Sequence, residues 1–338
     1  MKVYAAIDLH SNNSVLDVVD EAGGLLHERR YPNELPVIVE ALQKYGKDLV
    51  GVVVESTYNW YWLVDGLMAA GIRVHLAHTA AIAQYAGLKY SNDYTDARHL
   101  ADLLRLGILP EGHIYPKEQR GLRDLLRKRG TLVREQTRHC LSLQSLWTRH
   151  TGQQLSANSL RRLTPEDLAN RFSDAHVRQA AAVTHTLFQT LHKQVDALER
   201  SVHRELKRCA SLMHLQSAPG IGDILGLTIL LETGQILRFA SVGDYASYCR
   251  CVDSKRLSNG KKKGQGNAKS GNRYLAWAYI EAANFAIRFS PPIKRWYDRK
   301  RSKCHRMVAL KAVAHKLARA CYFMLREQTD FDLTRAFG

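Results

Sequence analysis

Hydrophobic and polar positions in the first third of the chain follow the short periods of strands and helices. Three strand patterns come first, VYAAIDL at 3–9, SVLDVVD at 14–20 and LLHERRY at 25–31, separated by the turns HSNN and EAGG. Helix and strand patterns then alternate: helix 36–46, strand 49–56, helix 61–71, strand 72–78 and helix 96–107. This order predicts a mixed α/β sheet with helices on its faces.

The pattern becomes helical between residues 117 and 213. Apolar positions recur every three or four residues at Leu187, Leu191, Val195, Leu198, Val202 and Leu206. The segment therefore predicts a long amphipathic helix. It could form an antiparallel coiled-coil pair with 118–148 or one face of an ordinary helical bundle, and either would serve as a spacer or dimerisation arm.

A third region begins at residue 214. It contains APGIGDILGLTILLETG, FASVGDYASYC, the Gly- and Lys-rich stretch SNGKKKGQGNAKSGNRYL, and two helical patterns that end near residue 325. We therefore expect three domains: an α/β domain at 1–112, a helical region at 113–213 and a basic, mostly helical domain at 214–338.

Composition is that of a soluble globular protein, with 45% hydrophobic and 24% charged residues in 338. No apolar run reaches the length of a membrane span and the start of the chain lacks a signal-peptide pattern, so we expect a cytoplasmic protein with no membrane partner. The six cysteines show no metal-ligand spacing and are expected to be reduced structural thiols.

Charge is distributed unevenly along the chain. Residues 1–110 hold 9 Lys/Arg and 13 Asp/Glu, whereas the rest holds 40 and 19. A mildly acidic region joined to a strongly basic remainder is typical of a nucleic-acid-binding protein whose acidic part has another task.

Four carboxylates occupy strand ends and one helix start in the α/β region. Asp8 ends the first strand, Glu55 ends the buried run VVVES, and Asp93 and Asp96 are spaced to lie on one face of a helix start. Clustered buried carboxylates repel unless cations lie between them. Their oxygen ligands suit Mg²⁺, with Mn²⁺ as a substitute, and two such ions can support phosphoryl transfer. We therefore predict a metal site.

Each carboxylate also has an ordinary interpretation. Asp8 could simply end a strand, Asp93 could cap a helix, and Asp96 could pair with a neighbouring basic residue. His10 is interpreted as a polar surface residue and is assigned no role. The AIDLHSNNS segment would also suit an actin-like or sugar-kinase ATPase, but no D-x-G-x-G pattern follows a strand, which argues against that class.

The basic surplus is densest between Lys255 and Arg306. This stretch contains 15 Lys/Arg, and its only acidic residues are Glu281 and Asp298. Aromatic residues interleave these charges, which favours nucleic-acid binding over a merely solvated face. The candidate nucleic-acid contacts are Lys255, Arg256, Lys261, Lys262, Lys263, Lys269 and Arg273.

Two turns in the C-terminal region have open interpretations. The P-G-I-G turn at 219–222 separates two helical patterns and could contact DNA phosphates or be a plain helix–helix turn. Ser258 stands in a Leu-Ser-Asn-Gly turn beside three lysines, and a serine needs a base, a metal or nearby cations to act as a nucleophile.

Taken in order, these motifs resemble a known family. Asp8, the VVVES strand with Glu55, D-x-x-D-A at 93–97, P-G-I-G, R-F at 238–239 and a later S-x-G stretch are similar to the DEDD transposases of insertion-sequence family 110, relatives of the Piv-type DNA invertases. SNGKKKGQGN followed by GNRYLAWA is similar to the 1111 subgroup. The resemblance covers about 3–110 and 214–325.

The resemblance implies a RuvC-like, RNase H-like N-terminal domain and a C-terminal transposase domain. It implies that Asp8, Glu55, Asp93 and Asp96 are both catalytic residues and metal ligands. It also implies a catalytic serine that attacks DNA and forms a phosphoserine link. The register counted from R-F gives Ser258, with Ser254 as the alternative.

The same resemblance implies an RNA-guided DNA recombinase. Its expected partners are donor and target DNA, an element-encoded bridge RNA, and further copies of the chain in a dimer or tetramer, where the serine of one protomer meets the carboxylates of another. A metal-dependent Holliday-junction-type nuclease without a covalent intermediate is the alternative function. A non-enzymatic nucleic-acid-binding protein is disfavoured because all four carboxylates are intact.

Overall fold

The computed structural model describes residues 1–82, 92–206, 210–253, 256–264 and 270–338. The chain divides into two units, Met1–Lys117 and Glu118–Gly338, and the first ends close to the boundary expected at 112. The further boundary expected at 213 stays a prediction. No helix in the described ranges is both long enough and apolar enough to cross a membrane.

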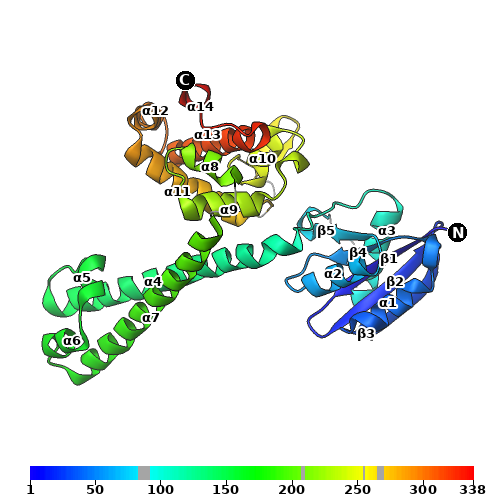
Figure 1. Ribbon diagram of the computed structural model, residues 1–338, viewed down its shortest axis with the longest axis horizontal. Coiled ribbons are helices and arrows are strands. Elements are labelled where there is room, and N and C mark those ends of the chain that lie inside the picture. The colour runs from blue at the N-terminus through cyan, green and yellow to red at the C-terminus, as the bar shows by residue number, and fades with distance from the viewer. Residues whose placement is uncertain (83–91, 207–209, 254–255, 265–269) are drawn as a thin grey trace. The chain divides into compact units, whose positions relative to one another are not determined.

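A five-stranded sheet forms the centre of the first unit, in the order β3-β2-β1-β4-β5 (Figure 1). The strands are β1 (Val3–Leu9), β2 (Asn13–Asp20), β3 (Leu25–Pro32), β4 (Leu49–Glu55) and β5 (Val74–Ala77). β1 is antiparallel to β2 and parallel to β4, so β1 and β4 end at the same edge of the sheet. The predicted mixed sheet is confirmed.

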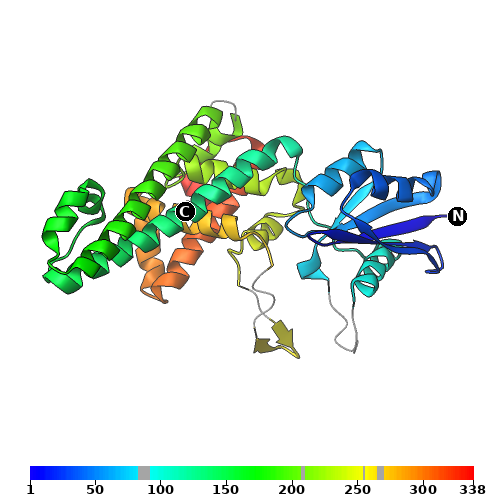
Figure 2. The same cartoon turned by 90° about the horizontal axis from the view of Figure 1, so that it is seen from below.

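Helices cover both faces of this sheet. The helical segments are α1 (Leu35–Gln43), η1 (Gly46–Asp48), α2 (Tyr61–Ala69), η2 (Thr79–Ala81) and α3 (Asp93–Arg105). Ile7 of β1 shares a core with α1 and α2, whereas its neighbour Ala6 packs with Leu100 of α3. Because side chains alternate across a strand, the two cores lie on opposite faces, as Figure 2 shows for α3 in teal and for α1 and α2 in blue.

Two long helices open the second unit and run antiparallel. They are α4 (Lys117–Thr151) and α7 (Ala175–Leu206), with α5 (Ala157–Arg162) and α6 (Pro165–Arg171) between them in the chain (Figure 1). An ion pair of 2.5 Å joins Arg129 Nη2 to Glu199 Oε1. Trp147 and Phe188 share a core with the short helices.

The buried side of α7 repeats every seven residues. Its buried apolar positions are Ala181, Phe188, Val195 and Val202. This spacing is that of a coiled-coil seam and favours the coiled-coil interpretation over an ordinary bundle face. Leu187, predicted on the apolar stripe, is 44% exposed because its neighbour Phe188, only 2% exposed, occupies the seam.

The rest of the second unit is a helical bundle with its own core. Its helices are α8 (Ala210–Ser217), α9 (Asp223–Thr233), η3 (Ile236–Arg238), α10 (Val242–Tyr248), α11 (Arg273–Phe289), α12 (Pro291–Arg301), α13 (Arg306–Glu327) and α14 (Leu333–Phe337). Buried hydroxyls link three of them: Tyr245 lies 2.8 Å from Thr233 and 2.7 Å from Tyr279. The described cysteines are free thiols, as expected: Cys140, Cys249, Cys251, Cys304 and Cys321.

A two-stranded hairpin interrupts the helices, formed by β6 (Arg256–Ser258) and β7 (Lys261–Gly264). Its two-residue turn has positive φ at both positions, 49° at Asn259 and 70° at Gly260. Asn-Gly is the residue pair best suited to this type I′ geometry, which matches the twist of the flanking strands. The turn predicted at this Asn-Gly pair is therefore a tight hairpin.

Candidate metal centre and serine hairpin

Asp8 and Glu55 lie side by side at the edge where β1 and β4 end. The strands are parallel neighbours, so their final residues come together. Ala6 and Val53, two residues earlier in each strand, pack in the core beneath α3. By alternation, Asp8 and Glu55 point to that same face, where Asp8 is only 5% exposed.

The two carboxyl groups lie within hydrogen-bonding reach of each other, and each affects the pKa of the other. Burial, then the hydrogen bond to Asp8 and repulsion from its charge, raises the pKa of Glu55 to about 7. Burial also raises the pKa of Asp8, although the hydrogen bond from Glu55 acts in the opposite direction. Two buried negative charges are therefore unfavourable here unless a cation lies close to them.

α3 brings the third and fourth carboxylates to this edge. Asn92 Oδ1 accepts a 2.9 Å hydrogen bond from the Thr95 amide, and Thr95 Oγ1 accepts one of 2.8 Å from the Asn92 amide. This capping box begins the helix at Asp93. Asp96 follows one turn later and is exposed. Both charges contribute to the raised pKa of Asp8, so Asp93 and Asp96 lie within electrostatic reach of it. Of the four predicted carboxylates, only Asp8 and Asp93 belong to the group whose ligand atoms lie within 4.8 Å of one another.

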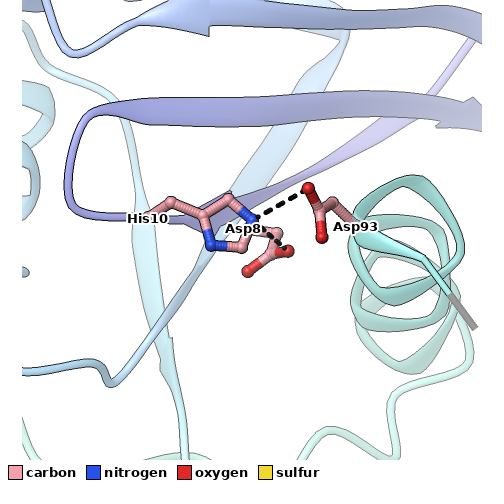
Figure 3. A group of neighbouring side chains, drawn as sticks. All are labelled: Asp8, His10 and Asp93. Atoms are coloured by element: carbon pink, nitrogen blue, oxygen red, sulfur yellow. Dashed lines mark ion pairs between the residues drawn. The ribbon is translucent and has the colours of Figure 1, made fainter.

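His10 lies between two of these carboxylates (Figure 3). Its Nε2 atom is 3.2 Å from Asp8 Oδ2 and 3.2 Å from Asp93 Oδ2. Its backbone carbonyl accepts hydrogen bonds of 3.0 Å from the side-chain amides of Asn33 and Asn59, which fix the loop after β1. One ligand atom from each of Asp8, His10 and Asp93 lies within 4.8 Å of the others, a spacing suited to a divalent metal ion.

Arg30 of β3 neutralises the outer side of the cluster. Its Nη2 donates to Asp93 Oδ2 at 2.6 Å and its Nη1 donates to Asn13 Oδ1 at 2.5 Å. The hydrogen bond from Arg30, with a smaller contribution from His10, holds the pKa of Asp93 below its usual range. Asp93 is therefore ionised and ready to act as a ligand over the whole physiological pH range.

Ser258 is the last residue of β6 and is exposed. In the hairpin register it pairs with Lys261 across the Asn259-Gly260 turn. Directly paired residues of antiparallel strands project to the same face, so a lysine stands next to the serine. Lys261 and Lys263 are both exposed. A hydroxyl in this position is accessible to a phosphate backbone.

The structure separates the other predicted nucleic-acid contacts. Arg256 and Lys262 lie in the strands of the hairpin, but Arg273 begins α11, with its guanidinium carbon 4.9 Å from the Tyr274 ring centroid. The carboxylates belong to the first unit and Ser258 to the second. Three predicted residues lie outside the described ranges: Ser254, Lys255 and Lys269.

Two family models match this chain. One, described as a transposase and built on the DEDD domain of IS110, matches residues 5–150, and the other, for transposases of the IS116/IS110/IS902 family, matches 212–298. Between them they cover more than half of the chain. The chain belongs to the IS110 family of transposases. The resemblance to insertion-sequence family 110 is thereby confirmed, and the 1111 subgroup stays a prediction.

A curated relative is similar over part of this IS110-family chain. It is an uncharacterized 43.6 kDa protein of insertion element IS110 from Streptomyces coelicolor, 26% identical over 144 residues. These residues are 42% of this chain and 35% of the relative, so the chain spans about a third of the relative's length. The first family match contains Asp8, Glu55, Asp93 and Asp96, and identifies the five-stranded sheet as an RNase H-like DEDD domain.

The P-G-I-G turn of this family member packs closely against α11. Gly220 has φ of +88°, and a Cβ there would lie 2.3 Å from the Ala282 carbonyl oxygen in α11, so only glycine fits. Asp223 already occupies the start of α9, where it accepts a 2.6 Å hydrogen bond from Gln216 and lies 3.0 Å from His203 Nδ1. A carboxylate at a helix start repels phosphate, which favours the plain helix–helix interpretation.

Two residues of the IS110-family cluster were missed by sequence reasoning. His10 did carry a signal, because residues two apart along an extended chain project to the same side, and Asp8 was already a candidate ligand. The structure places this partly exposed histidine beside Asp8 and Asp93, an arrangement that the sequence interpretation did not anticipate. Arg30 carried no signal in the sequence, since it reaches Asp93 from a strand 63 residues away in the sequence.

Proposed function

We propose that this chain is a DNA transposase that cuts and rejoins strands through a phosphoserine intermediate, with Mg²⁺ or Mn²⁺ at its carboxylates. The observation that carries the proposal is the meeting of Asp8, Glu55 and Asp93 at one sheet edge, with Asp96 one turn along α3. Ser258 is the proposed nucleophile, and Ser254 is the alternative.

The fit of a cation to this cluster is supported by its electrostatics. Burial raises the pKa of both Asp8 and Glu55, so a cation close to them would favour their ionised forms. Asp8, Glu55, Asp93 and Asp96 would hold the ion, with the His10 nitrogen also in reach. Bound there, a divalent cation would supply stabilisation of the negative charge on a scissile phosphate.

In the proposed reaction, the Ser258 hydroxyl oxygen attacks a DNA phosphorus. A serine–phosphate bond forms, the bond to the 3′-oxygen breaks, and the hydroxyl proton ends on that leaving oxygen. The 3′-hydroxyl of a second strand then attacks the phosphoserine, and the proton returns to the serine. One ester replaces another at each step, so strands rejoin without an external energy source.

The proposed partners are donor and target DNA, an element-encoded bridge RNA, and further copies of the chain in a dimer or tetramer. The positive charge supports the proposal of DNA and RNA partners, since residues beyond 110 hold 40 Lys/Arg against 19 Asp/Glu. The exposed Lys261 and Lys263 would contact phosphates beside Ser258. In the assembly, the serine of one protomer would act with the carboxylates of another.

A metal-dependent nuclease is the second candidate. It is favoured by the fact that His10 and all four carboxylates belong to the first unit, where a water could be the nucleophile without Ser258. Hydrolysis would leave broken strands and no bond between protein and DNA. The two functions therefore differ in one observable, a covalent adduct.

The test combines full-length protein, guide RNA, end-labelled DNA and Mg²⁺, followed by denaturing electrophoresis and peptide mass spectrometry. The expected result is labelled DNA attached to the peptide that contains Ser258. Ser258→Ala should bind RNA and DNA normally yet give neither adduct nor recombinant, whereas the exposed loop variant Ser270→Ala should match wild type. An adduct on Ser254 would correct the register, and wild-type product from Ser258→Ala would overturn the mechanism.

A further inference from the structure

A cavity of about 280 Å³ lies in the second unit between α4, α9 and α11. Arg123, Arg127 and Arg134 line it from α4, where their spacing places them on one side of the helix. Arg273 lines it from the start of α11. Glu232 of α9 is the only acid among the described lining residues, so the wall carries four positive charges against one negative charge.

Glu232 is engaged by the protein itself. It is 1% exposed, and Arg127 binds both carboxylate oxygens, through Nε at 2.6 Å and Nη2 at 2.8 Å. Asn272 donates to the same carboxylate at 2.7 Å. This network fixes the buried end of the cavity, whereas Arg134 and Arg273 are exposed. The accessible part of the wall is therefore cationic, which suits an anionic ligand.

Two aromatic side chains of α11 complete the wall. The Tyr274 ring centroid lies 4.4 Å from the Arg127 guanidinium carbon and 4.9 Å from that of Arg273. Trp277, one turn further along, lines the same cavity and is 38% exposed. Aromatic rings next to arginines are the means by which proteins hold unstacked bases, because the ring stacks on the base while the guanidinium pairs with phosphate.

We propose that this cavity binds one unstacked nucleotide of a single nucleic-acid strand. The base stacks on Trp277 and the phosphate pairs with Arg134 and Arg273. The cavity volume lies just below the range of drug-sized ligand pockets. A cavity of this size has room for one nucleotide but not for a duplex. The inference rests on the proposed function for the nature of the ligand, since a protein that exchanges strands must hold unpaired ones.

Gly130 offers a way to block the cavity without disturbing the fold. It lines the cavity in the middle of α4, and a Cβ there would meet only Arg134 Nη1, at 3.7 Å. Leucine favours a helix more than glycine does, so Gly130→Leu fills the space and strengthens α4. Gly121→Leu is the matched control, because Gly121 is in the same helix with nothing within 4 Å and does not line the cavity.

The experiment measures equilibrium binding of fluorescein-labelled hexauridylate, hexathymidylate and a 12-base-pair DNA duplex to the full chain in EDTA. We expect Gly130→Leu and Trp277→Ala to weaken binding of at least one single strand tenfold or more, with duplex binding unchanged. Gly121→Leu should match wild type, and Trp277→Phe should retain most of the affinity. Circular dichroism confirms that each variant is folded.

The two single-stranded probes identify the source of the nucleotide. A loss confined to hexauridylate assigns the site to RNA, and a loss confined to hexathymidylate assigns it to DNA. Single-strand affinities within twofold of wild type in both Gly130→Leu and Trp277→Ala would overturn the proposal, as would an equal loss on the duplex. Because no strand is cut in EDTA, failure of the covalent mechanism and failure of this site are distinguishable.

Discussion

At the scale of single residues, the proposed metal site makes a direct prediction about Asp8, Glu55 and Asp93. Asp8→Asn, Glu55→Gln and Asp93→Asn preserve side-chain size and remove one ligand charge each. Each should reduce DNA cleavage by about 100-fold or more, because a lost ligand weakens or displaces the ion. Binding of RNA and DNA should persist, since the basic surplus lies beyond residue 110. Gel assays measure the expected loss of cleavage, and fluorescence anisotropy measures the expected persistence of binding.

The matched control is Asp102→Asn, on the same helix as Asp93 but paired with Arg105. It should cleave like wild type. Asp96→Asn should lose less activity than Asp93→Asn, because Asp96 is exposed and is not among the residues whose ligand atoms lie within 4.8 Å of one another. Undiminished cleavage by any two of the first three variants would refute the metal assignment.

Asp17 of β2 makes stability depend on pH. It is fully buried, and neither carboxylate oxygen has a hydrogen-bond partner among the described residues. Burial, with repulsion from Glu28, raises its pKa to about 7, although Arg98 acts in the opposite direction. The folded state therefore binds this proton more tightly than the unfolded state. The free energy of unfolding should fall between about pH 4 and pH 7, by up to about 1.4 kcal/mol per pH unit, and level off above.

Asp17→Asn removes this dependence. Relative to wild type, the variant should be more stable at pH 8, and the difference should shrink steadily as the pH falls to about 4. Urea unfolding at intervals of one pH unit measures the difference. Glu40→Gln, at an exposed position of α1, should show no such trend. A difference between wild type and Asp17→Asn that is the same at every pH would rule out a raised pKa.

At the scale of elements, local patterns predicted most of the fold. The apolar patterns of β1, β2, β4 and β5 arise because each contributes residues both to the core beneath α3 and to the core beneath α1 and α2, whereas β3 contributes only Tyr31. Asn259-Gly260 marked the hairpin because few other pairs tolerate two positive φ angles. The seam of α7 was placed one residue off at Phe188, because periodicity alone does not decide which of two adjacent apolar residues faces the partner helix. That choice depends on the surface of the helix that packs against α7, which is formed by residues far away in the sequence.

The hairpin predicts how affinity responds to salt. Each lysine that contacts a phosphate releases counterions, so replacing Lys261, Lys262 and Lys263 together with glutamine should flatten the slope of log affinity against log salt by roughly two to three units. Filter binding or anisotropy from low to moderate salt gives the slope. The triple variant Lys2→Gln, Lys44→Gln, Lys47→Gln removes the same charge from the first unit and should leave the slope unchanged. An unaltered slope in the hairpin variant would place these lysines away from phosphate.

At the scale of the whole molecule, chemistry and charge are divided between the two units. The carboxylates lie in the first unit, whereas Ser258 and the densest basic stretch lie in the second. The sequence predicted this division from the count of charges on either side of residue 110. It could not predict whether the proposed serine acts with the carboxylates of its own chain or of another copy, because no local pattern encodes that pairing. The question is therefore one for an experiment on mixed protomers.

Complementation between two inactive variants answers it. Ser258→Ala retains the carboxylates and Glu55→Gln retains the serine, so each alone should form no adduct. If the serine of one protomer acts with the carboxylates of another, a mixed dimer contains one complete site. An equal mixture refolded or co-expressed should then recover about a quarter of the wild-type sites, since half of the dimers are mixed and each has one site of two. Mixing Glu55→Gln with Asp93→Asn, which both lack a carboxylate, should recover none. If differently tagged variants co-purify and the first mixture still gives no adduct, each site is built within one chain.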